Sequence, residues 1–455
     1  MLRYSWIWTA APLTVTDPSS WLWTGAGVQR DSIIVAGYGD EVDHRFANGK
    51  EPAGVSVIGD AMVEGYDGHF AMGETTLYTA PSGALVFSAG SIGWSGLLSC
   101  PGRWDARVQQ LVANLFSRFA GDGALGPAAL RPISLPPGAR APSYRAGAQV
   151  STVTSALLQP TAVAAAPNGD AIVLDQNRVV RVTPAGAVTP IAGGPAGFAD
   201  GPADAARFRE PRGLAVAANG DIFVADTANN RIRVISRGMV RTLAGSQRGY
   251  AEGTGAQALF AQPMALALTA AGTVLVADTW NQRLREVTLA GQVSTWAGDG
   301  QILSADGPGA QASLNYPLAL ALLPGGDVVL AEPATGRLRR VAGASPHAVS
   351  GLAGALGFEG YDDGAASSAG VSETLALTAR PDGQVILVDG ATSRVRALKA
   401  GAVDTLAGGT RGGTADGAGA TAGFAFPRGV GSAPDGSLLV VDAREHTLRR
   451  IVLAP

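Results

Sequence analysis

An acidic residue recurs six times at nearly equal spacing in the last two thirds of the chain, and this periodicity constrains the fold more than any other feature. The acids follow one another at intervals of 51, 52, 54, 57 and 53 residues and are Asp175, Asp226, Asp278, Glu332, Asp389 and Asp442. Self-similarity at a fixed period of this length is the signature of a repeat architecture. The sequence therefore predicts six copies of one structural unit.

Each unit has the pattern of four short β-strands. In the best copy, residues 214–216 are small and apolar, as in an inner strand, and Asn219-Gly220 is a hairpin turn signal before the apolar segment 222–224. Residues 231–234 alternate arginine with apolar residues, and a fourth segment completes the unit. Four antiparallel strands in each of six repeats are the plan of a β-propeller. The 62 glycines among 455 residues fit the many tight turns of such a fold.

The two ends of the repeat region predict that the ring is closed by strand pairing. The last unit ends after its third strand, at 448–453, whereas residues 148–153, just before the first unit, have the pattern of a fourth strand. Pairing of these two segments would complete the sixth blade and cover two strand edges. We therefore expect residues 148–455 to form a six-bladed β-propeller in a mainly β protein.

The N-terminal third lacks the repeat and is expected to form a smaller α/β region over residues 1–120. Residues 76–79 and 84–88 are strand-like, and residues 104–119 place apolar side chains on one face of an amphipathic helix. Residues 121–147 contain five prolines and few apolar residues, which predicts a semi-rigid linker.

Four motifs recur from unit to unit and carry a family resemblance. They are Pro211-x-Gly-Leu-Ala, Val224-Ala-Asp226-Thr-x-Asn-x-Arg231-Ile-Arg, Thr242-Leu-Ala-Gly245 and the loop type Asp306-Gly-Pro-Gly-Ala310. This pattern resembles the NHL repeat family. The resemblance covers about two thirds of the chain and implies a six-bladed propeller.

Three N-terminal segments carry a second resemblance. They are Trp23-Thr-Gly-Ala-Gly-Val28, Gly39-Asp-Glu41-Val-Asp43 and Tyr78-Thr-Ala-Pro-Ser-Gly-Ala84-Leu-Val-Phe-Ser-Ala-Gly-Ser91-Ile. In this order they resemble the C-terminal end of the large subunit of N,N-dimethylformamidase and its bacterial relatives. The resemblance implies a glutamine-amidotransferase-like α/β fold. It implies no catalytic residue here, because the chain is expected to begin inside that domain, beyond the family's iron ligands.

The acids of the repeat are each followed by an arginine, as Asp226 is by Arg231, except in the last unit, where Thr447 takes that place. We interpret these pairs as charge-assisted contacts across a hairpin. The Asp-Gly loops have too few acidic residues for a calcium cage of six to eight oxygens, and we interpret them as Asx-type turns. Their aspartates are Asp200, Asp306, Asp363 and Asp416.

Departures from the repeat mark the candidate binding residues. The loops between strands two and three and those between blades are expected on one face, where exposed aromatic residues would anchor a ligand. The aromatic candidates are Trp280, Tyr250, Tyr361, Phe198 and Phe358. At the mouth of the central channel, equivalent positions hold Thr161, Arg212, Met264, Leu318, Glu373 and Arg428. Arg212, Glu373 and Arg428 could receive an anionic or zwitterionic ligand. The alternatives are aromatic residues that fill gaps between blades and a rim that is merely solvated.

No sequence pattern predicts a catalytic residue, a cofactor or a metal site. The histidines lack metal-ligand spacing and are His44, His69, His347 and His446. The segments around Ser91 and Ser95 each lack one glycine of the Gly-x-Ser-x-Gly motif. The single cysteine, Cys100, excludes an intrachain disulfide.

Charge and hydropathy limit the class of partner. A net charge of −3 and a pI near 5.9 argue against binding to nucleic acid. No apolar stretch reaches the 18 or so residues of a membrane helix, and the N-terminus makes a poor signal peptide. A cytoplasmic location, with no membrane partner, is the default expectation.

These observations favour a non-catalytic binding or scaffolding propeller. It would recognise a peptide, carbohydrate or protein partner on its loop-rich face. Two enzymes remain as alternatives. One is an amidase-like hydrolase of which residues 1–120 are a partial domain, and the other is a metal-dependent propeller lyase or lactonase.

Overall fold

The chain forms two compact units, Met1–Ala139 and Arg140–Pro455. The structure, a computed structural model, describes residues 144, 147–354, 362–371, 374–390, 392–408 and 415–454, together with the backbone of five strands before residue 90.

The five N-terminal strands form an antiparallel sheet in the order β2-β1-β3-β4-β5. They are β1 (Leu13–Val15), β2 (Ile33–Ile34), β3 (Ser56–Glu64), β4 (Phe70–Thr79) and β5 (Leu85–Ser88). The helix expected over residues 104–119 lies outside the described residues.

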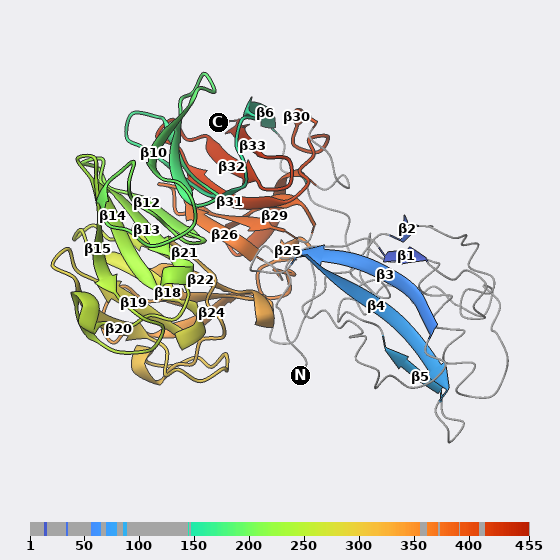
Figure 1. Ribbon diagram of the computed structural model, residues 1–455, viewed down its shortest axis with the longest axis horizontal. Coiled ribbons are helices and arrows are strands. Elements are labelled where there is room, and N and C mark those ends of the chain that lie inside the picture. The colour runs from blue at the N-terminus through green and yellow to red at the C-terminus, as the bar shows by residue number, and fades with distance from the viewer. Residues whose placement is uncertain are drawn as a thin grey trace. The chain divides into compact units, whose positions relative to one another are not determined.

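The second unit is the predicted six-bladed β-propeller (Figure 1). Each blade is an antiparallel sheet, and in the first five blades the four main strands run in sequence order from the inside outward. The first strands of successive blades contact one another in a closed ring, which places them at the centre. Four blades also have a two-residue fifth strand at the outer edge, which the four-strand pattern did not predict. These extra strands are β11 (Gly201–Pro202), β16 (Gly253–Thr254), β25 (Gly364–Ala365) and β30 (Gly417–Ala418).

The first three blades each have four main strands, which follow one another from the centre outward. Blade one has β7 (Pro160–Ala165), β8 (Ala171–Asp175), β9 (Arg178–Val182) and β10 (Val188–Gly193). Blade two has β12 (Gly213–Val216), β13 (Ile222–Asp226), β14 (Arg231–Ser236) and β15 (Met239–Gly245). Blade three has β17 (Pro263–Leu268), β18 (Val274–Asp278), β19 (Arg283–Val287) and β20 (Gln292–Ala297).

The remaining blades follow the same plan. Blade four has β21 (Ala319–Leu322), β22 (Val328–Glu332), β23 (Arg337–Val341) and β24 (Val349–Ala353). Blade five has β26 (Thr374–Ala379), β27 (Val385–Asp389), β28 (Arg394–Lys399) and β29 (Ala402–Gly408). Blade six has β31 (Pro427–Ser432), β32 (Leu438–Asp442), β33 (Thr447–Leu453) and β6 (Ala148–Thr154). The short 3₁₀ helices are η3 (Thr227–Asn229), η4 (Gly255–Gln257), η5 (Thr279–Asn281), η6 (Gly309–Gln311) and η7 (Pro333–Thr335).

Blade six joins the two ends of the propeller. The N-terminal β6, teal in Figure 1, lies beside the red β33. The two strands are antiparallel, with Leu448 opposite Thr154 and Leu453 opposite Ala148. The ladder therefore continues across the ends of the ring, and neither strand presents a free edge to the other.

The turns between the first and second strands have one conformation in all six blades. In blade two, the amide of Gly220 donates to the carbonyl of Ala217 (2.9 Å), and Gly220 has a φ of 87°. The left-handed conformation favours glycine, which explains the Asn-Gly and Asp-Gly signals of the sequence. The equivalent glycines have φ values of 80–88° and are Gly169, Gly272, Gly326, Gly383 and Gly436.

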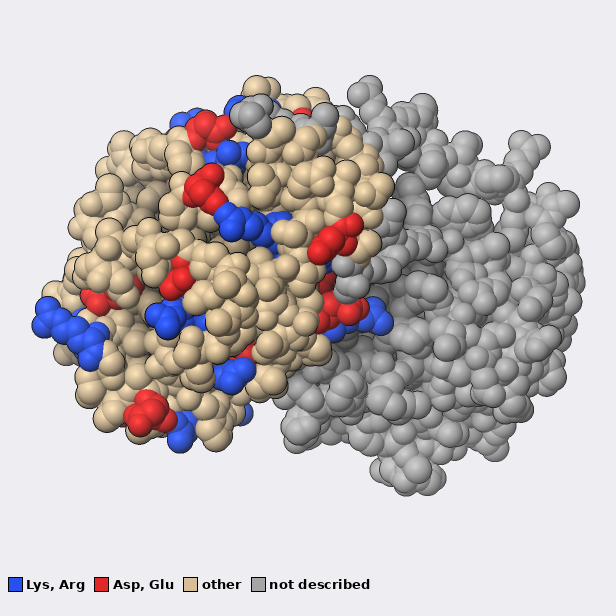
Figure 2. All heavy atoms as spheres, turned by 90° about the horizontal axis from the view of Figure 1, so that it is seen from above, with Lys and Arg blue, Asp and Glu red and all other residues tan. Residues whose placement is uncertain are grey.

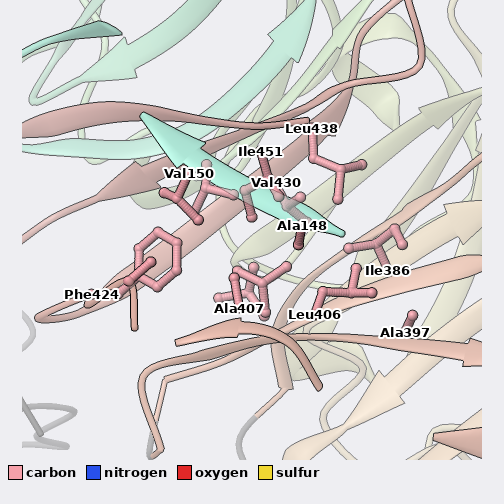
Figure 3. Packing of buried hydrophobic residues seen from close by; sticks show 14 residues of the cluster. Ala148, Val150, Ile386, Ala397, Leu406, Ala407, Phe424, Val430, Leu438 and Ile451 are labelled. Carbon is pink, nitrogen blue, oxygen red and sulfur yellow. The ribbon is translucent and has the colours of Figure 1, made fainter. Parts of the chain in front are cut away.

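The hydrophobic core lies between neighbouring blades. Figure 3 shows one cluster, in which Ala148 and Val150 of β6 and Phe424 meet Leu406 and Ala407 of blade five. The second strand of every blade is buried along its whole length, because it has a sheet neighbour on each side and a blade against each face. Because the core fills the space between the blades, the surfaces available for function include the two ends of the propeller, where the loops lie.

Candidate functional site

A buried network of acids and arginines supports the loops at one end of the propeller. The carboxylate of Asp226 is fully buried and accepts hydrogen bonds from Nη1 of Arg233 (2.6 Å) and from the amide of Arg209 (2.8 Å). The sequence-based pairing of Asp226 with Arg231 is therefore wrong. Arg231 is partly exposed and donates to the carbonyl of Asn229 (2.7 Å). A carboxylate without water needs a buried partner, and the arginine two residues further into the strand provides it.

The same arrangement recurs in blades three, four and five, whereas in blade six the second arginine, Arg449, pairs with Asp416 (2.7 Å). The acid and arginine are 2.9 Å apart in Asp278–Arg285, 3.1 Å in Glu332–Arg339 and 3.6 Å in Asp389–Arg396. Blade one has valine at that position, and there the first arginine does pair with the acid, Arg178 with Asp175, at 2.6 Å. Asp175, Asp278 and Glu332 also accept from amides just before the inner strand, as Asp226 does from that of Arg209, so the role of these acids is structural.

The aspartates of the Asp-Gly loops belong to the same network. Asp200 accepts from Nη2 of Arg233 (2.5 Å) and from the amide of Thr242 (3.1 Å), which lie in the two outer strands of blade two. Asp306 and Asp416 likewise bond to the buried arginines of their blades. The interpretation of these loops as Asx-type turns is wrong, because the carboxylates reach across the blade and not to their own turn.

Burial shifts the titration of the central acids. Loss of water raises the pKa of Asp278 to about 6, although hydrogen bonds from Asn281 and Ala261 and the charge of Arg285 oppose this shift. Burial also raises the pKa of Asp226. Neither carboxylate is accessible to a substrate, so we assign these shifts to the architecture and not to acid–base chemistry.

The loops between strands two and three lie at the same end as those between blades. Nδ2 of Asn229 donates to the carbonyl of Gly197 (2.8 Å), and Nδ2 of Asn281 donates to that of Gly249 (2.8 Å). Each bond joins a loop within a blade to the connection that precedes that blade. We call this end the loop-rich face, and it is the end to which the sequence assigns the aromatic candidates.

The aromatic candidates on the loop-rich face cover arginines and remain partly exposed. The ring of Tyr250 lies over the guanidinium of Arg283 (3.9 Å), and that of Phe198 lies over Arg231 (4.1 Å), while 46% and 48% of the two residues stay exposed. Such stacking gives each ring a fixed position. The two residues therefore combine packing within the blade with an apolar surface that faces solvent.

Trp280 is half-buried on the same face. It meets the ring of Tyr316 edge-on at 6.2 Å between centroids, and the guanidinium of Arg248 lies 4.8 Å from its ring. Tyr361 and Phe358 lie outside the described residues.

The channel-mouth candidates stand at the start of the inner strands. Arg212 is half-buried, with Nη2 4.0 Å from Oε2 of Glu210, and Arg428 is half-buried on β31. Glu373 lies outside the described residues. The three candidates thus remain a prediction as a ligand site.

Sequence reasoning missed two exposed apolar residues on the loop-rich face. Ile302 and Leu303 are 57% and 59% exposed in the connection between blades three and four. They stand next to Ser304, which takes the place that Phe198 and Tyr250 have in the preceding connections. The available signal was a pair of large aliphatic residues in a loop otherwise rich in small and polar residues.

A second feature missed from the sequence is a cavity at the opposite end of the propeller. It has a volume of about 930 Å³ and is lined by the turns between the first and second strands of all six blades. Its wall is mostly alanine, proline, glycine and leucine, with Arg380, Glu286 and Trp296 as the main charged or aromatic members. Alanine and proline are common at turn positions and do not indicate a binding site, so the sequence pattern did not reveal the cavity.

Neither a metal centre nor a membrane helix is found in the part of the chain that the structure describes. Among those residues, no three His, Cys, Asp or Glu side chains gather as a metal centre would require. In the same ranges, none of the helices has the length and apolar character to cross a bilayer.

Two family profiles match parts of the sequence. Residues 208–235 match the profile of the NHL repeat. The chain contains an NHL repeat. Residues 2–108 match the profile for the C-terminal part of N,N-dimethylformamidase beta-subunit-like proteins. Both resemblances inferred from the motifs are therefore confirmed. No curated protein matches the chain.

Solved structures are similar to this chain at low sequence identity. An auxiliary nutrient binding protein from Bacteroides ovatus is 11% identical, with 88% of this chain and 90% of that chain covered and a TM-score of 0.52. One from Bacteroides thetaiotaomicron is 12% identical, with 68% and 77% covered and a TM-score of 0.51. A catalytically inactive virginiamycin B lyase from Staphylococcus aureus is 10% identical, with 68% and 99% covered and a TM-score of 0.43. At such identities the first two likenesses extend to the fold alone.

Proposed function

We propose that this chain is a non-catalytic binding propeller that holds an apolar segment of a protein partner on its loop-rich face. The observation that carries the proposal is a series of exposed apolar side chains in successive connections between blades. They are Leu158, Phe198, Tyr250, Ile302 and Leu303. Exposed aromatic and aliphatic residues on rigid loops are typical anchors of protein interfaces.

The chemistry of this surface favours a peptide over a carbohydrate or a nucleic acid. Phe198 and Tyr250 are fixed by the arginines beneath them, so little side-chain entropy is lost when a partner binds. Ile302 and Leu303 offer no hydrogen-bonding groups for sugar hydroxyls. On the face of the molecule drawn in Figure 2, lysine and arginine are interspersed with aspartate and glutamate on a mostly uncharged surface, unlike the basic patch that a nucleic acid requires. The auxiliary nutrient binding proteins are examples of this fold among proteins whose names describe binding.

A selection experiment tests the proposal. A phage-displayed library of random peptides is selected against the full chain, and the enriched peptides are then measured on two variants. The double variant Phe198→Ser, Tyr250→Ser removes the two aromatic anchors. The control Met239→Ser, Leu289→Ser removes similarly exposed apolar residues from the hairpins that join strands three and four, at the opposite end.

We expect binding to fall by about 10-fold or more in the first variant, since loss of an interface anchor costs on the order of 2 kcal/mol. The control variant should bind as the unmodified chain does. Failure to enrich any peptide would contradict the proposal, and so would equal loss in both variants. Enrichment of a glycan, but no peptide, on a parallel glycan array would favour the carbohydrate alternative.

The match of residues 2–108 supports a second candidate, an amidase-like hydrolase in which the propeller recruits substrate. The test is release of dimethylamine from N,N-dimethylformamide by the purified full chain. Release above the buffer control, and proportional to protein concentration, would favour this function. A rate equal to the buffer control would count against it for this substrate.

A further inference from the structure

The cavity opposite the loop-rich face has the size and lining of a small-molecule site. Its volume of about 930 Å³ falls within the usual range of ligand pockets, several hundred to about 1,000 Å³. All six blades contribute one small or rigid apolar residue from the same turn position. These residues are Pro167, Ala218, Ala270, Pro324, Pro381 and Pro434. Because the turns are short and similar, the wall is preformed and needs no rearrangement to receive a ligand.

One blade departs from this apolar pattern by placing a cation in the wall. Arg380 follows the inner strand of blade five, where the other blades have alanine, threonine or leucine. Within the described residues its only side-chain hydrogen bond is a long one, from Nη1 to Oε1 of Gln384 (3.4 Å), and no carboxylate lies within 4.0 Å. The acid of the same turn, Asp382, is bonded by Nζ of Lys399 (2.7 Å), and the charge of Arg380 acts on it without a hydrogen bond between them. The guanidinium of Arg380 therefore retains hydrogen-bond donors for a ligand.

The acid that lines the cavity is already satisfied by the protein. Glu286 accepts from Oγ1 of Thr273 (2.6 Å) and from Nε1 of Trp296 (3.0 Å), and the indole of Trp296 stacks on His347 at 4.1 Å between ring centroids. Glu286 thus holds Trp296 in place as part of the wall. Its negative charge in the same cavity disfavours a ligand with more than one negative charge.

We propose that this cavity binds a small monocarboxylate with an apolar body, whose carboxylate pairs with Arg380 and whose body packs against the ring of prolines and alanines. A planar guanidinium matches a carboxylate through two parallel hydrogen bonds. A phosphate ester would bring a second charge toward Glu286, and among the described residues of the wall only Arg380 is a cation that could receive it. The cavity lies at the opposite end from the loop-rich face. The test of this proposal is therefore independent of the test of the proposed function.

Phenylbutyrate and the uncharged phenylbutanol are matched probes for this site. Binding of each to the full chain is measured by isothermal titration calorimetry and by saturation-transfer NMR. We expect the acid to bind more tightly than the alcohol. Arg380→Gln should weaken binding of phenylbutyrate by about 10-fold or more and leave binding of phenylbutanol unchanged, because only the carboxylate pairs with the charge of Arg380. Arg241→Gln, which changes an exposed arginine of β15 outside the cavity, should bind both probes as the unmodified chain does.

A third variant tests the location of the ligand. Ala218→Trp places a large side chain in an exposed turn of the wall, where it fills space without disturbing the core, and it should abolish binding of both probes. The proposal is overturned if the acid does not bind, if it binds Arg380→Gln unchanged, or if both probes still bind Ala218→Trp. Circular dichroism of each variant establishes that the propeller is intact.

Discussion

The fully buried arginines of the propeller should contribute far more to stability than the ion pairs on its surface. The sharpest case is Arg233, which donates to the buried carboxylate of Asp226 (2.6 Å), to Asp200 (2.5 Å) and to the carbonyl of Ala199 (2.7 Å). Arg233→Met keeps most of the apolar stem and removes the charge. The carboxylate of Asp226 then remains in the core without its cation. Breaking a buried pair in this way costs about 3–5 kcal/mol.

The matched control is Lys399→Met, which removes a cation from an exposed pair. Lys399 lies 2.7 Å from Asp382, but their side chains are 45% and 43% exposed. An exposed pair of this kind contributes about 0–1 kcal/mol. The two variants lose the same charge, so the difference between them isolates the effect of burial.

Urea denaturation followed by far-ultraviolet circular dichroism measures both effects. We expect the free energy of unfolding to fall by about 3–5 kcal/mol in Arg233→Met and by less than about 1 kcal/mol in Lys399→Met. Adding Asp226→Asn to Arg233→Met should restore at least about 1 kcal/mol, because the stranded charge is then gone. Equal loss in the two single variants, or no recovery in the double variant, would refute the reasoning.

Three further predictions concern the ring, the core and a turn. Gly429→Ala should cost about 1–3 kcal/mol in thermal unfolding, because its Cβ would lie 2.9 Å from the inner strand of blade one, whereas Gly325→Ala meets nothing within 4 Å and should be neutral. Phe424→Ala should cost about 3–5 kcal/mol in urea denaturation, since its side chain is fully buried between blades (Figure 3), and a loss below about 1 kcal/mol would contradict that burial. The amide of Gly343 holds the pKa of Asp327 below its usual range, so this acid stabilises the fold above about pH 4 and the contribution is lost as the pH falls through the lowered pKa. Asp327→Asn should therefore be less stable than the unmodified chain at about pH 7, by up to about 1 kcal/mol, and a difference that persists undiminished at low pH would disprove this assignment.

The sequence by itself determined the architecture of the repeat region. Strand alternation, turn glycines and six evenly spaced acids are local properties of the chain, and each recurs often enough to define a unit. The patterns at the two ends placed residues 148–153 beside residues 448–453, and in the structure β6 and β33 lie side by side. Repetition made this possible, because the missing strand of the last unit is visible only by comparison with the other five.

Only the tertiary structure decided which side chains meet. Arg231 and Arg233 are two residues apart on one strand, so their side chains point to the same face. The sequence therefore could not say which of them reaches Asp226. The pairing depends on how deeply each arginine is buried. Arg231, nearer the loop, is partly exposed to water, whereas Arg233 is fully buried. The cavity around Arg380 depends on six turns from different blades that converge at one end of the ring. Sequence periodicity shows to which face of its strand a side chain points. The burial of that side chain, and the meeting of turns from different blades, arise only when the ring closes. Burial determines the ion-pair network, and the meeting of turns determines the cavity.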